Sequence, residues 1–284
     1  MDVSIIIVTY NTKQLTKNCI DSIFKFTQDI TFEVILVDNA STDGSQELFS
    51  LDHRIIYIYS DENLGFGRAN NLGLSKANGK YIFLLNSDTY LKNNAVKIFK
   101  QAMDQQDPSI ACLGTMLEDT AGKITTSYGQ YLSFQHFFYR RSTKWPAHLP
   151  SDGLIVPVII GADLFIRKNI IDQEGFFDPR FFMYHEENDL QRRYAKAGYY
   201  SKIITGPEIV HLEGGSSKSK INYLAIEGGH TYMKKWSSAG TYIAYRIMYA
   251  LTRFPKIITK KTTISHKLQC LSSLFMYKVK NYDT

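Results

Sequence analysis

The sequence predicts an α/β fold built on a doubly wound, mostly parallel β-sheet. Three observations support this prediction. Apolar, β-branched runs recur along the first hundred residues, segments with helical spacing separate them, and polar turn residues end each run. Such runs are typical of strands buried on both faces of a parallel sheet. Their alternation with helices favours the doubly wound architecture.

The first predicted strand is the run 4–8, which ends at the turn Thr9, Tyr10 and Asn11. Apolar residues then recur at helical spacing over 15–24. This spacing predicts a helix of about 12 residues whose apolar face covers the sheet.

Three more strands are predicted at 32–37, 55–59 and 81–85, and the fourth runs into the polar turn 86–88. In open α/β sheets ligands bind beyond the carboxyl ends of the strands, so Asp88 is well placed there to hold a cation. From these residues alone, however, a turn or a helix cap is the more common interpretation.

The glycines after the third strand have the spacing Gly65-x-Gly67-x-x-Asn70. A dinucleotide fingerprint needs a third glycine and follows the first strand, so the sequence disfavours an NAD enzyme. The first turn, at residues 9–11, has no glycine, which also disfavours a sugar nucleotidyltransferase.

Regular periodicity weakens after Phe99. Segment 115–157 is rich in aromatic and turn-forming residues and includes the cations Arg140, Arg141 and Lys144. Such a segment could be a mobile lid or an acceptor-facing loop, or it could simply pack as an irregular part of the core.

A further strand is predicted over 156–167, interrupted at Gly161, Ala162 and Asp163. A glycine inside a strand can mark close approach to a ligand or to another strand.

Three acids, Glu186, Glu187 and Asp189, open a helix that Gly198 ends. Acids in a first turn complement the helix dipole, which accounts for one or two of them. Like charges at close range also raise one another's pKa, which is one way to prepare a carboxylate as a general base.

His211 follows the predicted strand residues 209–210 and precedes the glycine-serine stretch 214–217. A single histidine is often structural, but a neutral imidazole at a strand end is also a common metal ligand. Both interpretations stay open from these residues.

The composition indicates a globular protein of one large or two modest domains, with 284 residues and 44% hydrophobic residues. Cys19, Cys112 and Cys270 lie far apart, without the spacing of a zinc site or a disulfide framework, which favours a reducing cytoplasm. Neither a signal peptide nor an apolar run long enough to span a membrane is recognisable.

The C-terminal segment 228–284 contains ten Lys or Arg residues and one Asp, a net charge of +9, so the remaining residues carry −3 of the total of +6. A basic segment indicates contact with an anionic surface. Nucleic acid is disfavoured because no recognised binding motif accompanies the charge. Apolar residues at helical spacing over 242–254 favour peripheral attachment at the inner face of the membrane. The alternative is a helical pair packed on the body.

Taken together, these stretches resemble the family-2 inverting glycosyltransferases with the GT-A fold, and within them the rhamnosyltransferase-like branch of surface polysaccharide synthesis. The order and spacing of the motifs match over residues 3–236. The matching stretches are 5–11, 37–45, 62–73, 84–89, Gly161-Ala162 and the acidic helix start.

The resemblance implies site residues. Asp88 is similar to the last acid of the Asp-x-Asp signature and would bind Mg²⁺ or Mn²⁺, with His211 as a further contact. Gly161 and Ala162 would contact the acceptor. The residues implied to bind the nucleotide-sugar are Thr9, Tyr10, Asn11, Asp38, Asn63, Gly65, Asn86, Ser87 and Asp88.

The family pattern Glu-Asp-x-Asp aligns with Glu186, Glu187 and Asp189 as the catalytic group. Its second acid is the usual base, which makes Glu187 the predicted base and leaves Glu186 as a competitor.

The resemblance also implies a domain division. Residues 1–236 would form the catalytic domain, with a nucleotide-sugar half at 1–110 and an acceptor half at 111–236. Residues 237–284 would form a basic, amphipathic helical extension.

The implied activity is transfer of a sugar, such as rhamnose or another hexose, from a nucleoside-diphosphate sugar to a hydroxyl of a glycan or lipid-linked acceptor. The alternative is a catalytically inactive sugar-nucleotide-binding module.

Overall fold

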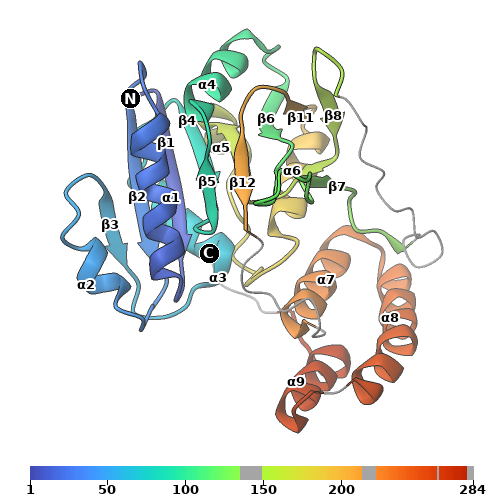
Figure 1. Ribbon diagram of the computed structural model, residues 1–284. Coiled ribbons are helices and arrows are strands. Elements are labelled where there is room, and N and C mark those ends of the chain that lie inside the picture. Colours follow the sequence, from blue (N-terminus) through green and yellow to red (C-terminus); the bar gives the residue numbers. More distant parts are fainter. Residues whose placement is uncertain (135–148, 213–221, 261, 280–284) are drawn as a thin grey trace.

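The structure, a computed structural model, describes residues 1–134, 149–212, 222–260 and 262–279 (Figure 1). The predicted lid cations Arg140, Arg141 and Lys144 and the stretch 214–217 lie outside the described residues.

The central sheet has eight strands in the order β3-β2-β1-β4-β10-β6-β11-β8. Its first four strands are parallel, and they confirm the four runs predicted from the sequence. These strands are β1 (Val3–Thr9), β2 (Phe32–Asp38), β3 (Ile56–Tyr59) and β4 (Tyr81–Leu85).

The other half of the sheet is mixed. β10 (Asp163–Arg167) runs antiparallel between β4 and β6 (Ile110–Thr115), while β11 (Tyr200–Ile204) runs parallel to β6. β8 (Leu154–Val156) pairs antiparallel with β11 at the edge.

The interrupted strand predicted over 156–167 is confirmed in part, because the structure divides this segment further and begins β10 already at Asp163. The chain forms β8, then β9 (Val158–Ile159), and reaches β10 only after a break at Gly161 and Ala162. At this break the carbonyl of Ala162 accepts a hydrogen bond from the Asn86 backbone N–H (3.1 Å), so it contacts the end of β4.

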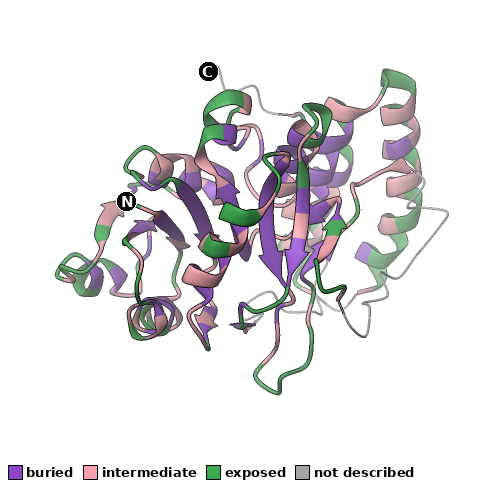
Figure 2. Ribbon diagram, turned by 90° about the horizontal axis from the view of Figure 1, so that it is seen from above, coloured by how far each residue is buried: buried purple, intermediate pink, exposed green. Residues whose placement is uncertain are grey.

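Helices cover both faces of the sheet, which confirms the doubly wound α/β architecture. On one face α1 (Lys13–Phe26) and α4 (Ala95–Gln105) pack against alternate strand residues such as Ile5 and Phe83. The opposite core cluster lies beneath the helices on the other face, which are α3 (Gly65–Leu74), α5 (Lys168–Glu174) and α6 (Glu186–Lys196). Figure 2 shows the buried strands between these layers.

Shorter elements complete the body. The helix α2 (Ser45–Phe49) inserts Phe49 into the first core cluster. Two short antiparallel ribbons form outside the central sheet, β5 (Thr89–Leu91) with β12 (Ile209–His211) and β7 (Tyr128–Gly129) with β9.

Three helices follow the body: α7 (Tyr223–Trp236), α8 (Ala239–Thr259) and α9 (Ile264–Phe275). They pack on one another and form the helical unit drawn in orange and red in Figure 1. α7 shares this unit although it precedes residue 237, and the predicted domain boundary stays a prediction. None of the helices within the described ranges is long and apolar enough to cross a membrane.

Candidate functional site

A cavity of about 280 Å³ lies where the end of β4 meets the start of α6. It brings together six residues that the sequence singles out from four separate stretches. The lining residues are Phe66, Asn86, Ile160, Gly161, Ala162, Met183, Tyr184, Glu186, Glu187 and His211.

Asp88 and His211 face each other beside this cavity. The β5–β12 ribbon pairs Thr89 with His211, and it places Nε2 of His211 3.3 Å from Oδ1 of Asp88. Within the described ranges the Nδ1 atom of His211 has no hydrogen-bond partner. A carboxylate and an imidazole suit a divalent cation.

No group of three or more His, Cys, Asp or Glu side chains that could hold a metal occurs among the described residues. A cation held by Asp88 and His211 would therefore need further ligands, such as diphosphate oxygens or water. Mg²⁺ is commonly bound in this way, through one or two carboxylates and substrate phosphates. The chemistry of the pair thus fits a cation shared with a nucleotide.

The first predicted turn is held by a chain of hydroxyl groups. Thr9 is buried, and its Oγ1 lies 3.0 Å from that of Thr12 and 2.8 Å from that of Thr16. Thr12 in turn contacts the hydroxyl of Ser87 (3.1 Å). These bonds join the end of β1 to the turn that carries Asp88.

Asn11 links the loop after β1 to the loop after β2. Its backbone has a positive φ of 54°, and its side-chain oxygen accepts a hydrogen bond from Thr42 N (2.7 Å). Its own backbone N–H donates to Ser41 Oγ (3.0 Å). The neighbouring Tyr10 is 50% exposed, so its ring is available to a ligand.

Asp38 is fully buried and both of its oxygens accept hydrogen bonds. One accepts from Ser41 N (2.9 Å) and the other from the hydroxyl of Tyr57 (2.7 Å). Burial and this carboxylate together raise the pKa of Tyr57. Asp38 therefore holds the loop after β2, while its predicted contact with a base or ribose stays a prediction.

Asn39 organises the loop before α3, although it is not among the site residues predicted from the sequence. Its side-chain amide donates to Asn63 Oδ1 (2.9 Å) and its oxygen accepts from Leu64 N (2.7 Å). The Asn63 oxygen also accepts from Gly65 N (2.9 Å). An asparagine immediately after a strand-end aspartate was the only signal available in the sequence.

Gly65 is required by its surroundings. Its φ is +77°, and a Cβ there would lie 2.0 Å from the carbonyl oxygen of Phe182. That same oxygen accepts a hydrogen bond from Phe66 N (2.9 Å). The loop before α3 is thereby joined to the segment before α6.

Tyr184 and His185 both adopt a φ of 70° immediately before α6. Non-glycine residues in this region are costly and persist only where the surroundings impose them. Here α7 imposes this conformation because it packs closely on the turn. A Cβ at Gly228 of α7 would lie 2.3 Å from the carbonyl oxygen of Tyr184. This turn directs Glu186 and Glu187 into the cavity.

The two glutamates differ in exposure. Glu186 is 4% exposed and its Oε2 has no hydrogen-bond partner within the described ranges, whereas Glu187 is partly exposed. Burial, and then the charge of Glu187, raises the pKa of Glu186 well above its usual range. Burial also raises the pKa of Glu187. Carboxylates of raised pKa are better proton acceptors.

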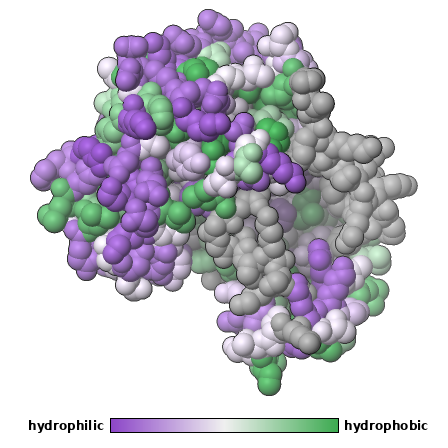
Figure 3. All heavy atoms as spheres, viewed as in Figure 1, coloured by the Kyte–Doolittle hydropathy of each residue, from purple (hydrophilic) through white to green (hydrophobic). Residues whose placement is uncertain are grey.

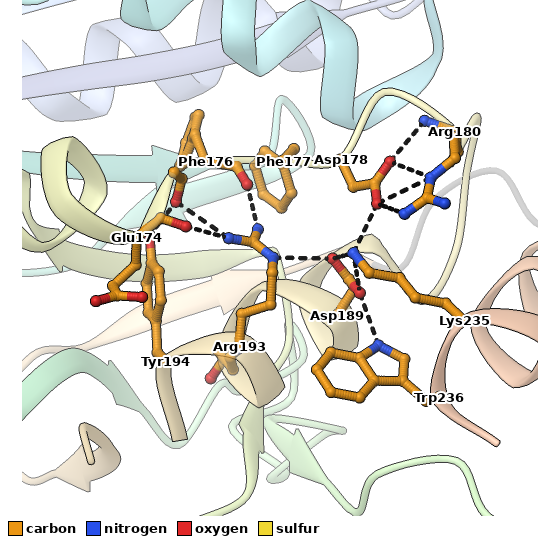
Figure 4. Close-up of polar contacts among 12 residues, drawn as sticks. Glu174, Phe176, Phe177, Asp178, Arg180, Asp189, Arg193, Tyr194, Lys235 and Trp236 are labelled. Carbon is orange, nitrogen blue, oxygen red and sulfur yellow. Dashed lines mark hydrogen bonds and ion pairs between the residues drawn. The ribbon is translucent and has the colours of Figure 1, made fainter. Parts of the chain in front are cut away.

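Asp189 does not line this cavity, although it lies only two residues after Glu187. It is fully buried, and Figure 4 shows its carboxylate in a network of charged side chains. Its carboxylate contacts Arg193 Nε (3.1 Å), Lys235 Nζ (2.7 Å) and Trp236 Nε1 (2.7 Å).

Lys235 also pairs with Asp178 (2.6 Å) and so bridges two carboxylates. Burial opposes ionisation of Asp178, but hydrogen bonds from Arg180 and Lys235 hold its pKa well below the usual range. The network joins the first turn of α6 to the end of α7. It points to a positioning role for Asp189, whereas its predicted catalytic role stays a prediction.

The mixed sheet, the Asp88–His211 pair at the end of β4 and the acidic start of α6 define a glycosyltransferase of the GT-A fold. Residues 4–174 match the sequence profile of the family described as Glycosyl transferase family 2. Because this match covers more than half of the chain, the chain belongs to the family-2 glycosyltransferases.

Two curated relatives are similar over most of the chain. Glycosyltransferase GlyG of Streptococcus pneumoniae is 27% identical over 213 residues, covering 71% of this chain and 67% of the relative. The N-acetylglucosaminyl-diphospho-decaprenol L-rhamnosyltransferase of Mycobacterium tuberculosis is 25% identical over 230 residues, covering 70% and 73%.

Solved structures show the same fold at low sequence identity. Mannosyltransferase PcManGT of Pyrobaculum calidifontis, in complex with GDP-Man and Mn²⁺, has a TM-score of 0.58 at 17% identity, covering 97% of this chain and 81% of that one. GalNAc-T7 with UDP, GalNAc and Mn²⁺ has a TM-score of 0.66 at 16% identity, covering 96% of this chain. This chain spans only 54% of the length of GalNAc-T7.

Proposed function

We propose that this chain is an inverting glycosyltransferase that transfers a hexose, such as rhamnose, to a hydroxyl of a glycan or lipid-linked acceptor. The donor would be a nucleoside-diphosphate sugar, and the product would belong to a cell-surface polysaccharide. One observation carries the proposal. His211, which contacts Asp88, lines the same cavity as the two glutamates of α6.

Asp88 and His211 would hold Mg²⁺ or Mn²⁺ on the diphosphate side of the cavity. Such a cation supplies Lewis-acid stabilisation of the leaving diphosphate. The two solved structures above that contain Mn²⁺ together with a sugar or nucleotide support this assignment.

Glu187 is the proposed base. It takes the proton of the acceptor hydroxyl as the hydroxyl oxygen forms a bond to the anomeric carbon. The bond from that carbon to the diphosphate breaks on the opposite face, so the configuration inverts. Glu187 is favoured over Glu186 because it is the more exposed of the two acids that line the cavity. A base so placed typically contributes about 10² to 10⁴ in rate.

A thermal-shift panel of nucleoside diphosphates and their sugars, with and without Mn²⁺, tests the donor half. We expect one nucleotide to stabilise the protein in the presence of metal, and Asp88→Ala to abolish this stabilisation. NMR of the product anomer then tests inversion. Donor binding with neither hydrolysis nor transfer to any acceptor offered would instead support an inactive sugar-nucleotide-binding module.

The helical unit supports a further proposal, that the protein attaches peripherally to an anionic membrane. One face of α8 buries Tyr245 and Ile257 against its neighbours. The opposite face is exposed and apolar, and Figure 3 shows hydrophobic spheres along the lower edge of this unit. Its exposed residues are Ile243, Ile247, Leu251, Phe254 and Ile258, with Ile264 and Leu268 on α9.

Apolar helix faces combined with basic residues are typical of helices that lie in the membrane interface. Co-sedimentation with anionic vesicles at low salt tests this attachment. Protein that stays in the supernatant at every anionic lipid fraction would contradict it.

A further inference from the structure

A second cavity, of about 490 Å³, lies between α7 and α8. Three cations line it: Arg253 and Lys256 of α8, and Lys260, the residue that follows the end of this helix. Over the described part of the chain, none of the three lies within ion-pair distance of a carboxylate. We call this cavity the basic groove.

The basic groove is held in shape by its own aromatic and cap residues. The guanidinium of Arg253 lies 5.2 Å from the ring centroid of Tyr249, which also lines the groove. At the other wall Asn222 caps α7, because its side-chain oxygen accepts from Leu224 N (3.0 Å). Such contacts lower the entropy that the side chains lose on binding a ligand.

One hydrogen bond connects the two cavities. The side-chain amide of Asn222, in the basic groove, donates to the hydroxyl of Tyr184 (2.6 Å), and Tyr184 lines the catalytic cavity. The wall of the basic groove is therefore in direct contact with the wall of the catalytic cavity.

We propose that the basic groove binds the phosphate or diphosphate group of the acceptor while the acceptor hydroxyl lies at Glu187. This inference rests on the proposed function and adds the chemical class of the acceptor. A neutral glycan would not require three cationic side chains in its binding site. They suit a group with two or more negative charges, and a guanidinium can bind phosphate oxygens in a bidentate manner.

The same chemistry could come from a lipid-linked diphosphate or from a soluble phosphate. Farnesyl diphosphate and inorganic diphosphate are the two probes that separate these sources. Calorimetric titration of the full chain in EDTA, which withdraws metal from the Asp88 site, gives the dissociation constant of each.

The variant to test replaces Arg253, Lys256 and Lys260 together by Gln. We expect its dissociation constant for farnesyl diphosphate to rise at least tenfold. If the binding of inorganic diphosphate weakens as strongly, the ligand is a phosphate group and the lipid makes no contribution. A loss confined to farnesyl diphosphate would indicate a lipid-linked acceptor.

The charge-matched control replaces the exposed Lys76, Lys123 and Lys234 by Gln, and it should bind both probes as the unaltered chain does. Equal affinities in the two triple variants, or no binding of either probe to the unaltered chain, would overturn the proposal. So would a groove variant that loses binding only to phosphatidylglycerol vesicles.

Two further measurements keep the inference separate from the proposed function. Nucleoside-diphosphate binding with Mn²⁺ should remain within twofold in the groove variant, which also shows that it folds. If it does not fold, Lys256→Gln alone carries the test, because Lys256 is exposed. Absence of donor hydrolysis and transfer in the unaltered chain would instead refute the proposed function, whatever the diphosphate affinities.

Discussion

Glu186 and Glu187 are adjacent in sequence, yet they meet different surroundings at the start of α6. Glu186 is buried in the cavity wall near Gly67, whereas Glu187 is partly exposed. A proton acceptor must reach the substrate hydroxyl, so the more exposed acid is the better base.

Replacing the proposed base should therefore remove turnover and leave donor binding intact. We expect Glu187→Gln to lower kcat by about 10² to 10⁴ while the donor dissociation constant stays within twofold. Initial rates and a metal-dependent thermal shift measure the two effects. Glu186→Gln is the matched comparison, and a larger loss of kcat there would transfer the role of base to Glu186.

The raised pKa values predict the pH dependence of transfer. Burial raises the pKa of Glu187, and a base is active only when it is deprotonated, so the rate should fall as the pH drops through that raised pKa. The acidic limb of kcat/KM should lie above about pH 4.3, the value of an unperturbed glutamate. A pH–rate profile with its acidic limb at or below that value would contradict the assignment.

At the scale of elements, the partly buried Lys235 helps to join α7 to α6. Lys235 contacts Asp178 and Asp189, and its own side chain is 20% exposed. Removal of one partner from a buried ion pair leaves the other charge uncompensated and typically costs about 3 to 5 kcal/mol.

We expect Lys235→Met to lower the free energy of unfolding by about 3 kcal/mol, because Arg193 and Trp236 still satisfy part of Asp189. Urea unfolding measures this change. Lys234→Met, at the exposed neighbouring position, is the control and should have little effect. A loss in Lys235→Met no larger than in the control would show that the network does not hold the two helices.

His230 should make the helical unit sensitive to acid. It is fully buried among tyrosines, and burial followed by the charge of Arg246 lowers its pKa to about 4. An unfolded histidine titrates near 6.5, so between about pH 6.5 and 4 the unfolded state binds a proton that the folded state does not. Stability is therefore lost as the pH falls through this window.

Replacing His230 tests whether it causes the loss of stability in this pH range. His230→Phe should reduce the loss of unfolding free energy between pH 7 and 4 by up to about 3 kcal/mol. The exposed His53→Phe serves as control. Identical slopes of stability against pH in the two variants would refute the role of His230.

The local sequence pattern predicts a helix or strand well only where the apolar residues of that segment alone indicate how it is buried. The four parallel strands were predicted because each is a short apolar run followed by turn residues. β6 was missed, and β10 was predicted only as part of a longer strand, because the pairing of both is set by strands far away in the sequence. The same holds in the site: Asp88 and His211 stand out at strand ends, whereas Asn39 and Lys235 act through contacts with distant segments.

At the scale of the whole molecule, the charge and the exposed apolar surface of the helical unit face different directions. Arg253 and Lys256 line the basic groove, while Ile247 and Leu251 lie on the outer face, 56% and 65% exposed. An orientation with this outer face in the membrane interface would place the groove beside the lipid headgroups.

The outer face supplies the last prediction. Full burial of a Leu or Ile side chain is worth roughly 1.5 to 3 kcal/mol, and partial insertion at an interface gains less. The double variant Ile247→Gln and Leu251→Gln should therefore lower partition into anionic vesicles by roughly tenfold or more, at about 1.4 kcal/mol per tenfold change.

Leu51 and Ile155 provide the matched control, because they are 74% and 58% exposed but lie on the catalytic body. Their double replacement by Gln removes similar apolar surface and should leave vesicle binding unchanged. If both double variants lose binding equally, attachment depends on general surface hydrophobicity rather than on the face of α8. If neither loses binding, the basic residues alone would carry the attachment, and raised salt should then release the protein completely.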